Sequence, residues 1–338
     1  YPACVGWVDR EMPGWTRKQL VESVGLVRDL LLPNWDIHPE MVTHTWGIDV
    51  RTGRPYADWT EANMENWGFS VGKSADFLTE YLAYSLTILK NAGLPCEGVT
   101  TPGGFGNKVL DELSLATLRS CRDVFDAEIP HYFRHLYTDE RSVAPRVENA
   151  KLDGDRPECV VSIIGGTGDW FGGWDGLETP DADKFIAEDL TSGRMVEVIA
   201  RGEPAIMVCH WPGIYCNGEK TGFETFKTVV DRLERRYDHL VWMKLSEIAR
   251  YWAAKELTAI APAADGIAFE APFGTPAFTV RFRSATGGLR HVAGGTESRL
   301  RSVGRVLDLV PGTFHRDGGA VTACFDLPRG KSRLVVTS

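Results

Sequence analysis

Two histidines have the spacing of ligands to one metal ion at the end of an expected strand. His38 lies in the expected strand 36–42, and His44 follows just after it. In parallel α/β proteins, the side chains that do chemistry gather at the carboxyl ends of the strands. Because His38 and His44 are six positions apart, an even offset, an extended chain directs both to one face, together with Glu40. The spacing therefore favours a metal site; a structural role for these histidines is the alternative.

A third histidine, His210, directly follows the apolar stretch 204–209 and precedes the aromatic residues Trp211 and Tyr215. An imidazole changes its charge near neutral pH, so this position suits a general acid or base. We expect His210 to project into the same end of the sheet as His44, from the opposite side. A packed structural histidine is again the alternative.

A glycine-rich acidic loop, residues 165–175, follows the apolar run 159–164. It lacks the Gly-Lys-Ser/Thr ending of a phosphate loop, and its acidic side chains repel anions. Its Asp169, Trp170 and Trp174 suit a neutral polyol, because indole rings stack on sugars and a carboxylate binds hydroxyl groups. We expect Trp211 and Tyr215 to join this surface; a merely packed loop is the alternative.

The sequence lacks the usual motifs of several other classes of enzyme and metal-binding protein. His131 and His135 are four residues apart and would share a face of a helix, but no HExxH motif accompanies them, so we expect a structural role. No GxSxG motif and no GxGxxG motif opening a helix occurs. The seven cysteines include no CxxC pair, which argues against a structural zinc module.

The elements that must position these residues alternate between strands and helices over residues 1–255. Such alternation indicates a parallel sheet, open or closed into a barrel. The expected strands are 3–8, 36–42, 98–100, 159–164, 204–209 and 240–245, with 122–125 extended, and the expected helices are 16–32, 74–91, 111–121, 181–201, 223–237 and 246–255.

The last part of the chain, 256–338, has a different pattern. Short alternating runs with Gly and Pro between them predict an all-β, sandwich-like accessory domain. The expected strands are 267–270, 277–283, 304–309, 320–326 and 333–337.

The composition excludes some partners. The net charge of the 338 residues is −9, and no run of Lys or Arg occurs, so a nucleic-acid partner is not expected. No apolar stretch reaches the roughly 18 residues that a membrane helix needs. The oligomeric state and the compartment, cytoplasmic or exported, stay open.

Several segments, in this order, resemble polysaccharide deacetylases of the NodB type (carbohydrate esterase family 4-like), within the glycoside hydrolase/deacetylase barrel superfamily. They are CVGWVDREMPGW with WDIHPEMVTHT, ILKNAGLPCEGVTTPGGFGN, Gly168-Asp169-Trp170 and Val208-Cys209-His210. The resemblance implies an irregular (β/α)7 barrel, whose first strand, with the family's Asp pair, lies upstream of Tyr1. It also implies a divalent metal, zinc in the first place.

The resemblance assigns roles residue by residue. His44 matches the family's first metal-binding histidine. The position of the second is Ile48, so His38 is the candidate second ligand, ahead of Asp49. Thr100 replaces the family's Arg, whereas the turn with Pro102 and Gly103 remains and is expected to let the backbone approach the substrate.

The expected function is therefore metal-dependent removal of an N- or O-acyl group, such as acetyl, from a carbohydrate, with His210 as the general acid. Two alternatives stay open. One is a glycoside hydrolase on the same barrel, with carboxylates drawn from Glu40, Asp169 and Asp175. The other is a carbohydrate-binding protein without catalytic activity that has lost the metal.

Overall fold

The computed structural model describes residues 14, 16–134, 142–283 and 287–337, so the expected strand 3–8 and His135 lie outside the described residues. The chain divides into two compact units. Unit 1 comprises Tyr1–Asn149 and Val160–Ser246, and unit 2 comprises Ala150–Cys159 and Glu247–Ser338. The sequence placed the boundary near residue 255, inside what is helix α8, and did not anticipate that residues 150–159 belong with unit 2.

Unit 1 contains a four-stranded sheet in the order β3-β4-β6-β5. β3, β4 and β6 are parallel, and Gly98, His131 and Val161 lie in register. The helix considered for His131 and His135 is wrong, because His131 opens strand β4. The bounds are β3 Gly98–Thr101, β4 His131–Arg134, β5 Arg146–Lys151 and β6 Glu158–Ile164.

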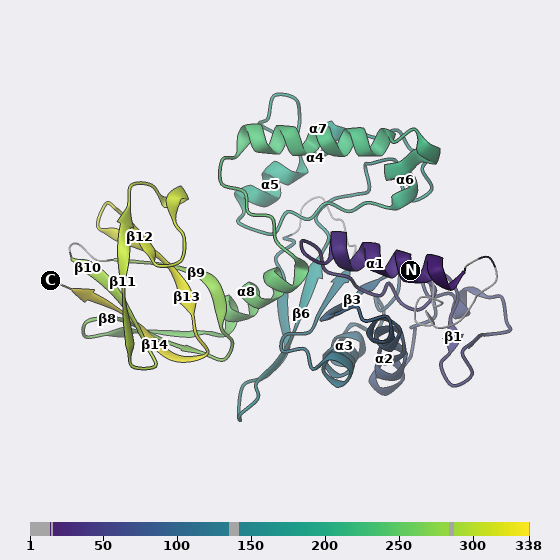
Figure 1. Cartoon of the computed structure of the whole chain (residues 1–338), viewed down its shortest axis with the longest axis horizontal. Coiled ribbons are helices and arrows are strands. Elements are labelled where there is room, and N and C mark those ends of the chain that lie inside the picture. Colours follow the sequence, from purple (N-terminus) through teal and green to yellow (C-terminus); the bar gives the residue numbers. More distant parts are fainter. Residues whose placement is uncertain (1–13, 15, 135–141, 284–286, 338) are drawn as a thin grey trace. The chain divides into compact units, whose positions relative to one another are not determined.

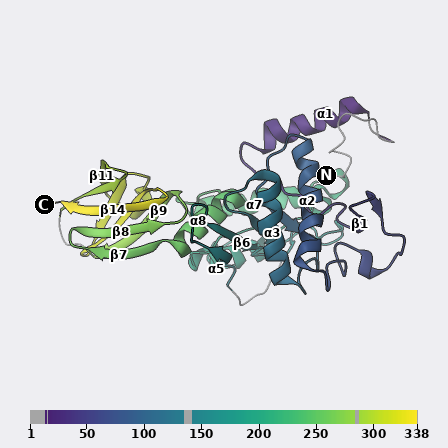
Figure 2. The same ribbon diagram turned by 90° about the horizontal axis from the view of Figure 1, so that it is seen from below.

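Helices α2 (Ala75–Asn91) and α3 (Leu110–Phe125) lie side by side against this sheet (Figures 1 and 2). Their leucines share one core with Val99 of β3 and Tyr132 of β4. The helix predicted over 74–91 is confirmed as α2, with Ser74 as its N-cap, whereas α3 continues through residues 122–125, which the sequence suggested were extended. A further helix, α1 (Arg17–Leu26), begins with a capping box at Thr16 and continues as a π-turn, Val27–Leu31.

A second group of helices in unit 1 has its own small core around Phe171 and Phe185. The single helix expected over 181–201 is interrupted. The carboxylate of Asp189 accepts the N–H of Thr191 in a turn, and Gly193 takes a φ of +107°. The helices are α4 Ala182–Phe185, α5 Arg194–Ala200, α6 Trp211–Tyr215 and α7 Thr221–Arg236, with a 3-10 turn at Cys216–Gly218.

The expected strands 36–42, 204–209 and 240–245 are not strands among the described residues. Two of these segments lie beside the sheet but do not pair with it as strands. Pro39 accepts a single backbone hydrogen bond from Thr100, and Ile206 accepts a single one from Gly166, whereas a strand needs a ladder of such bonds. A short hairpin, β1 (Ile48–Asp49) with β2 (Arg54–Pro55), and a 3-10 turn, Glu61–Asn63, follow the first segment. The fold is mixed α/β, and a seven-stranded barrel is not seen in the described part of the chain.

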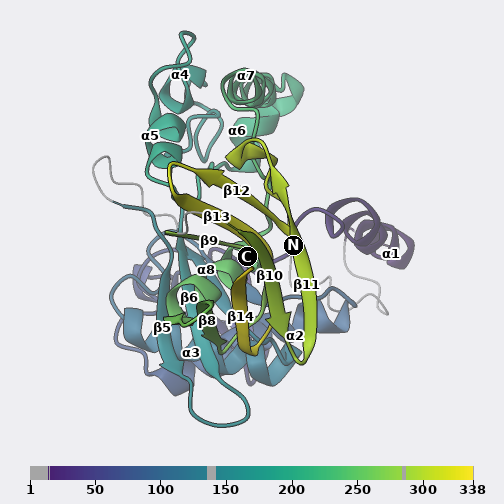
Figure 3. The ribbon, with the colours of Figure 1, turned by 90° about the vertical axis from the view of Figure 1, so that its left-hand side faces the viewer.

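Unit 2 contains one continuous eight-stranded sheet in the order β7-β8-β14-β10-β11-β12-β13-β9, which curls on itself (Figure 3). The sandwich-like arrangement of two sheets is thus replaced by one curled sheet around Phe269, Phe278 and Phe325. Residues 304–309 form a 3-10 turn, Val306–Asp308, instead of a strand. The elements are α8 Leu245–Leu257, β7 Ala259–Ala263, β8 Gly266–Ala271, β9 Thr275–Arg283, β10 Gly288–Ala293, β11 Thr296–Val303, β12 Thr313–Asp317, β13 Ala320–Leu327 and β14 Gly330–Thr337.

No helix in the described ranges combines the length and the apolar character needed to cross a membrane. The six described cysteines are all free thiols.

Candidate functional site

His210 and Asp169 meet because the segments that carry them run side by side. The N–H of Gly166 donates to the carbonyl of Ile206 over 3.1 Å, and the N–H of Val208 donates to Oγ1 of Thr167 over 3.0 Å. Both segments therefore end at the same place, and His210 reaches Asp169. Its backbone N–H donates to Oδ2 of Asp169 over 3.1 Å, and its Nδ1 lies 2.7 Å from the same oxygen.

Glycines fix the loop after Asp169 against the helix after His210. A Cβ on Gly172 would lie 2.9 Å from the backbone of Gly213, and a Cβ on Gly213 would lie 2.6 Å from the carbonyl of Gly173. A Cβ on Gly222, in the first turn of α7, would lie 2.0 Å from the carbonyl oxygen of Phe171. Only glycine allows these backbones to approach so closely, so the loop is packed rather than a flexible hinge.

The Asp169 carboxylate affects the pKa of His210 and determines which ring nitrogen is left to exchange a proton. Its hydrogen bond to Nδ1 raises the pKa of His210, against the opposing effect of burial. With Nδ1–H donating to the carboxylate, Nε2 is the atom left to exchange a proton on a ring that is 36% exposed. The second oxygen of Asp169, Oδ1, is buried and has no hydrogen-bond partner among the described residues.

His44 is paired with Glu40, whose Oε1 lies 3.4 Å from Nε2 of His44. The hydrogen bond with Glu40 raises the pKa of His44. The backbone here is unusual, since Met41 and His44 have φ values of 60° and 70°. Residues other than glycine rarely hold this conformation unless the surroundings impose it, and such strain is often found at functional sites.

The buried carboxylate of Glu65 imposes that backbone. It accepts hydrogen bonds from the N–H of Val42 over 3.1 Å and of Thr43 over 2.9 Å, immediately before His44. The hydroxyl group of Tyr81, on α2, donates to the same carboxylate. Burial raises the pKa of Glu65, and these hydrogen bonds oppose the shift.

The two histidine–carboxylate pairs are neighbours. The charges of Glu40 and His44 both act on the pKa of His210, Glu40 raising it and His44 lowering it. We call Glu40, His44, Asp169 and His210 the histidine site. The sequence expected His44 and His210 at one end of the sheet, and the two rings lie within the range over which the charge of His44 affects the pKa of His210.

Exposed aromatic rings adjoin His210. Trp211 is 71% exposed and its ring centroid lies 5.6 Å from that of Tyr215, also exposed on α6. Trp174 is 70% exposed. Trp170, by contrast, packs edge-on against Phe185 at 5.0 Å. Of the four expected sugar-binding rings, three are therefore open to solvent, whereas Trp170 is partly buried and packs against the core of the second group of helices.

The remaining expected residues have local structural roles. A Cβ on Gly103, with φ of +47°, would lie 2.4 Å from the carbonyl oxygen of Asn66, so packing already explains this glycine. Pro102, the residue before it, is buried. Asp175 accepts the N–H of Leu177 in an exposed turn.

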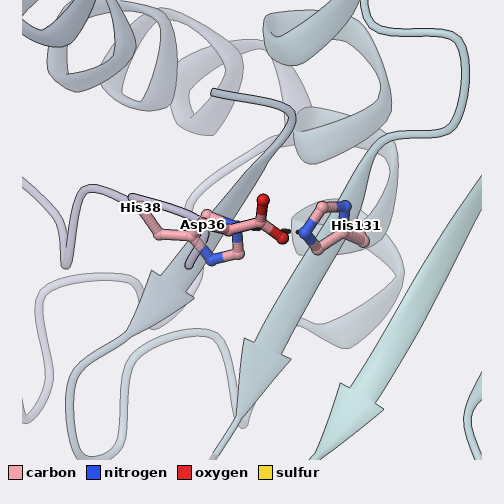
Figure 4. A group of neighbouring side chains, drawn as sticks. All are labelled: Asp36, His38 and His131. Atoms are coloured by element: carbon pink, nitrogen blue, oxygen red, sulfur yellow. Dashed lines mark hydrogen bonds between the residues drawn. The ribbon is translucent and has the colours of Figure 1, made fainter. Parts of the chain in front are cut away.

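His38 lies in a different group from His44. The Nε2 atoms of His38 and His131 are 3.0 Å apart, and the ligand atoms of Asp36, His38 and His131 all lie within 4.8 Å of one another. Figure 4 shows the three side chains turned toward one another, with His131 at the start of its strand. We call them the amino-edge triad; they could hold a metal ion.

Burial lowers the pKa of both imidazoles of the amino-edge triad and so favours their neutral form. It lowers the pKa of His38 well below its ordinary range, with a further lowering by the charge of His131. It also lowers the pKa of His131, although the charge of Asp36 opposes this. A neutral imidazole is the form that binds a metal.

Sequence reasoning missed three of these residues. Nothing in the pattern around Glu65 or Asp36 distinguishes them from other surface carboxylates. His131 was noticed, but the spacing to His135 directed attention to a helix. Its position beside Gly98 results from the pairing of β3 with β4, which the local sequence pattern does not contain.

Comparison of the chain with protein-family models finds no match, and comparisons with curated proteins and with solved structures find none either. The resemblance to deacetylases therefore rests on the sequence motifs, and the function is argued from the site.

Proposed function

We propose that the protein is a hydrolase that removes an N- or O-acyl group from a carbohydrate at the histidine site. The observation that carries the proposal is the pairing of His210 with Asp169, 2.7 Å apart, with Nε2 left available. This is how a histidine is held to transfer protons, with its tautomer and orientation fixed by a carboxylate.

In the proposed reaction, water attacks the acyl carbonyl and passes a proton to the Glu40 carboxylate, which later releases it to solvent. His210 donates a proton from Nε2 to the amine or alkoxide as its bond to the acyl carbon breaks, and the acyl group leaves as the free acid. Asp169 orients the ring and stabilises its protonated form. The hydrogen bond with Glu40 raises the pKa of His44, and in its protonated form this side chain would add positive charge to the histidine site. Such a fixed charge stabilises the oxyanion that forms at the carbonyl.

The divalent metal implied by the resemblance would find two donors here, Glu40 and His44. A catalytic zinc site has three protein ligands. Among the described residues, the group of three side chains that could hold a metal ion includes neither Glu40 nor His44. Glu40 and His44 alone therefore do not fit a catalytic zinc ion, and no step of the proposed reaction uses a metal ion.

The carbohydrate part of the proposal rests on the exposed rings of Trp174, Trp211 and Tyr215. Indole and phenol rings combine an apolar face with a polar edge, which suits the faces and hydroxyl groups of a sugar. The position of Trp211 and Tyr215 directly after His210 would place a bound sugar beside the proton donor.

We also propose that unit 1 is an irregular barrel of the (β/α)7 kind. Two hydrogen bonds support this: Pro39 joins the segment 36–42 to β3, and Ile206 joins the segment 204–209 to Gly166, just after β6. The order of these segments around the parallel strands is then the order of the chain, as in β/α barrels.

The test is release of acetate from acetylated oligosaccharides, both N-acetylated and O-acetylated, by the full chain. We expect His210→Ala to lower turnover by about 10²–10⁴-fold, the usual contribution of a general acid or base. His239→Ala is the matched control, because His239 is exposed and also contacts a carboxylate, that of Asp238, at 3.0 Å. Activity of His210→Ala within threefold of the parent would rule out this mechanism, and binding of the sugars without any acetate release would favour the carbohydrate-binding alternative.

A further inference from the structure

We propose that Asp36, His38 and His131 bind one divalent first-row transition metal ion, zinc in the first place, as a stabilising centre at the amino edge of the unit 1 sheet. Two imidazoles and one carboxylate are the donors that such ions prefer, whereas magnesium and calcium take oxygen ligands. The proposal does not depend on the proposed function.

The spacing of the donor atoms already approaches that of a metal site. Two ligands that each lie 2.0–2.1 Å from a tetrahedral zinc ion are about 3.3 Å apart. The Nε2 atoms of His38 and His131 are separated by 3.0 Å. The Asp36 carboxylate completes the group, since the ligand atoms of all three side chains lie within 4.8 Å of one another.

Two of the three ligands have partners that orient them. Oγ1 of Thr100 lies 3.3 Å from Nδ1 of His38, so it can accept the Nδ1 proton and leave the Nε2 lone pair for a metal. The backbone N–H of Ser246 donates to Oδ2 of Asp36 over 2.6 Å, and its hydroxyl group donates to Oδ1 over 3.1 Å. Hydrogen bonds of this kind to metal ligands are a regular part of metal sites.

The strand next to the triad leaves room for it. Gly98 is in register with His131, and a Cβ at this position would lie 2.7 Å from Nε2 of His131. Any other residue here would occupy the space of the His131 ring. The sequence therefore supplies glycine where two imidazoles need to approach.

The location indicates a stabilising role. His131 opens β4, and the residues that lead to the histidine site follow the carboxyl end of β6. In parallel α/β folds the amino edge serves stability and the carboxyl edge serves function. An ion bound here would fasten the segment at residues 36–38 to β4 and to Ser246, three stretches far apart in the chain.

The experiment measures metal on the full chain. We expect about one equivalent of zinc after purification and dialysis, and, after removal of metal by a chelator, titration with Co²⁺ to produce the visible absorption bands of a tetrahedral site. His38→Gln and His131→Gln should reduce the bound metal to under about a tenth of an equivalent. Thr100→Val should weaken Co²⁺ binding by about 10–100-fold, as expected for the partner of a ligand.

His44→Gln and His239→Gln are the controls, and both should keep the metal. Since His38 is partly exposed, His38→Gln remains informative if His131→Gln does not fold. The chelator should lower the Tm of the parent, and added zinc should restore it, but neither should affect His38→Gln. Absence of metal binding by the parent, or loss of metal in His44→Gln with retention in His38→Gln, would overturn the proposal.

Discussion

The Nδ1 atom of His210 lies 2.7 Å from Oδ2 of Asp169, and the backbone N–H of the same histidine donates to that oxygen over 3.1 Å. One carboxylate oxygen thus fixes both the ring and the main chain from which it projects. Oδ1 of Asp169 is left buried and without a partner among the described residues. A carboxylate oxygen that is buried without a hydrogen-bond partner costs free energy.

We predict that Asp169→Asn shifts the titration of His210 to lower pH. The hydrogen bond with Asp169 is the main cause of the raised pKa of His210, and the charge of the carboxylate adds to it. NMR titration of the His210 ring measures this directly, without a known substrate. In an active preparation, the fall of kcat on the alkaline side should move in the same direction, because a general acid works only while protonated.

The same pair makes stability depend on pH. Because the folded-state pKa of His210 is raised above 6.5, its protonation stabilises the fold at lower pH, and this contribution is lost as the pH rises through the folded-state value. The difference in the free energy of unfolding between the parent and Asp169→Asn should therefore be larger at pH 5.5 than at pH 8.5. A difference that grew with pH, or an unshifted His210 titration, would contradict the pairing.

A second prediction concerns the glycines that hold the histidine site together. Gly213→Ala would place a Cβ 2.6 Å from the carbonyl oxygen of Gly173, between two backbones that cannot easily move apart. We expect it to lower the free energy of unfolding by about 1–3 kcal/mol, as overpacking does. Chemical denaturation measures this loss.

Gly25→Ala is the control for Gly213→Ala. Gly25 lies within α1, and the nearest atom to its added Cβ is at 3.9 Å, on the flexible side chain of Arg28. Alanine favours the helix by about 1 kcal/mol relative to glycine, so this variant should be neutral or more stable. Equal losses in both variants would show that close backbone packing is not what Gly213 provides.

Part of the histidine site could be predicted from the sequence, and part could not. Because the ends of parallel strands meet at one edge, the sequence placed the loop with Asp169 and His210 at the same end of the sheet. It expected Asp169 to bind sugar hydroxyl groups and did not predict its hydrogen bond with His210. His38 and His44 were expected on one face of an extended segment. The left-handed backbone at Met41 and at His44 interrupts the alternation of side chains. For this reason His44 pairs with Glu40, and His38 pairs with His131.

The fold was predicted best where a pattern is long. α2 and the continuous apolar run of β6 lie where their periodicity placed them. The segments 36–42, 204–209 and 240–245 have the composition of strands, but a strand also requires a ladder of hydrogen bonds to a neighbour. Whether such a ladder forms depends on the neighbouring segment, about which the local sequence pattern carries no information. Four residues, as in β4, are too few to distinguish a strand from a helix.

A third prediction tests the residue that the sequence did not reveal. Glu65→Gln replaces one acceptor oxygen with an amide that cannot accept from Val42 or Thr43. Leaving a buried donor unpaired costs about 1–3 kcal/mol, so we expect a loss of that size in the free energy of unfolding. The NMR signal of His44 should also change, because Glu65 holds the segment before it.

Two variants make the Glu65 experiment specific. Glu61→Gln changes an exposed carboxylate on the same segment and should have little effect on stability. Tyr81→Phe removes the hydroxyl group that donates to Glu65. The double variant of Glu65 and Tyr81 should lose less than the sum of the single losses, since both act in one hydrogen-bond network. Strict additivity would mean that the two do not stabilise each other.

The last prediction separates the aromatic residues by role. Trp211→Ala removes a ring that is 71% exposed, so the free energy of unfolding should stay within about 0.5 kcal/mol of the parent, while oligosaccharide binding, measured by calorimetry, should weaken by about 2–10-fold. Trp170→Ala removes a ring packed against Phe185 and should cost up to about 3 kcal/mol of stability instead. If Trp170→Ala kept full stability and lost sugar binding, whereas Trp211→Ala bound normally, the sugar surface would lie on the loop and not on α6.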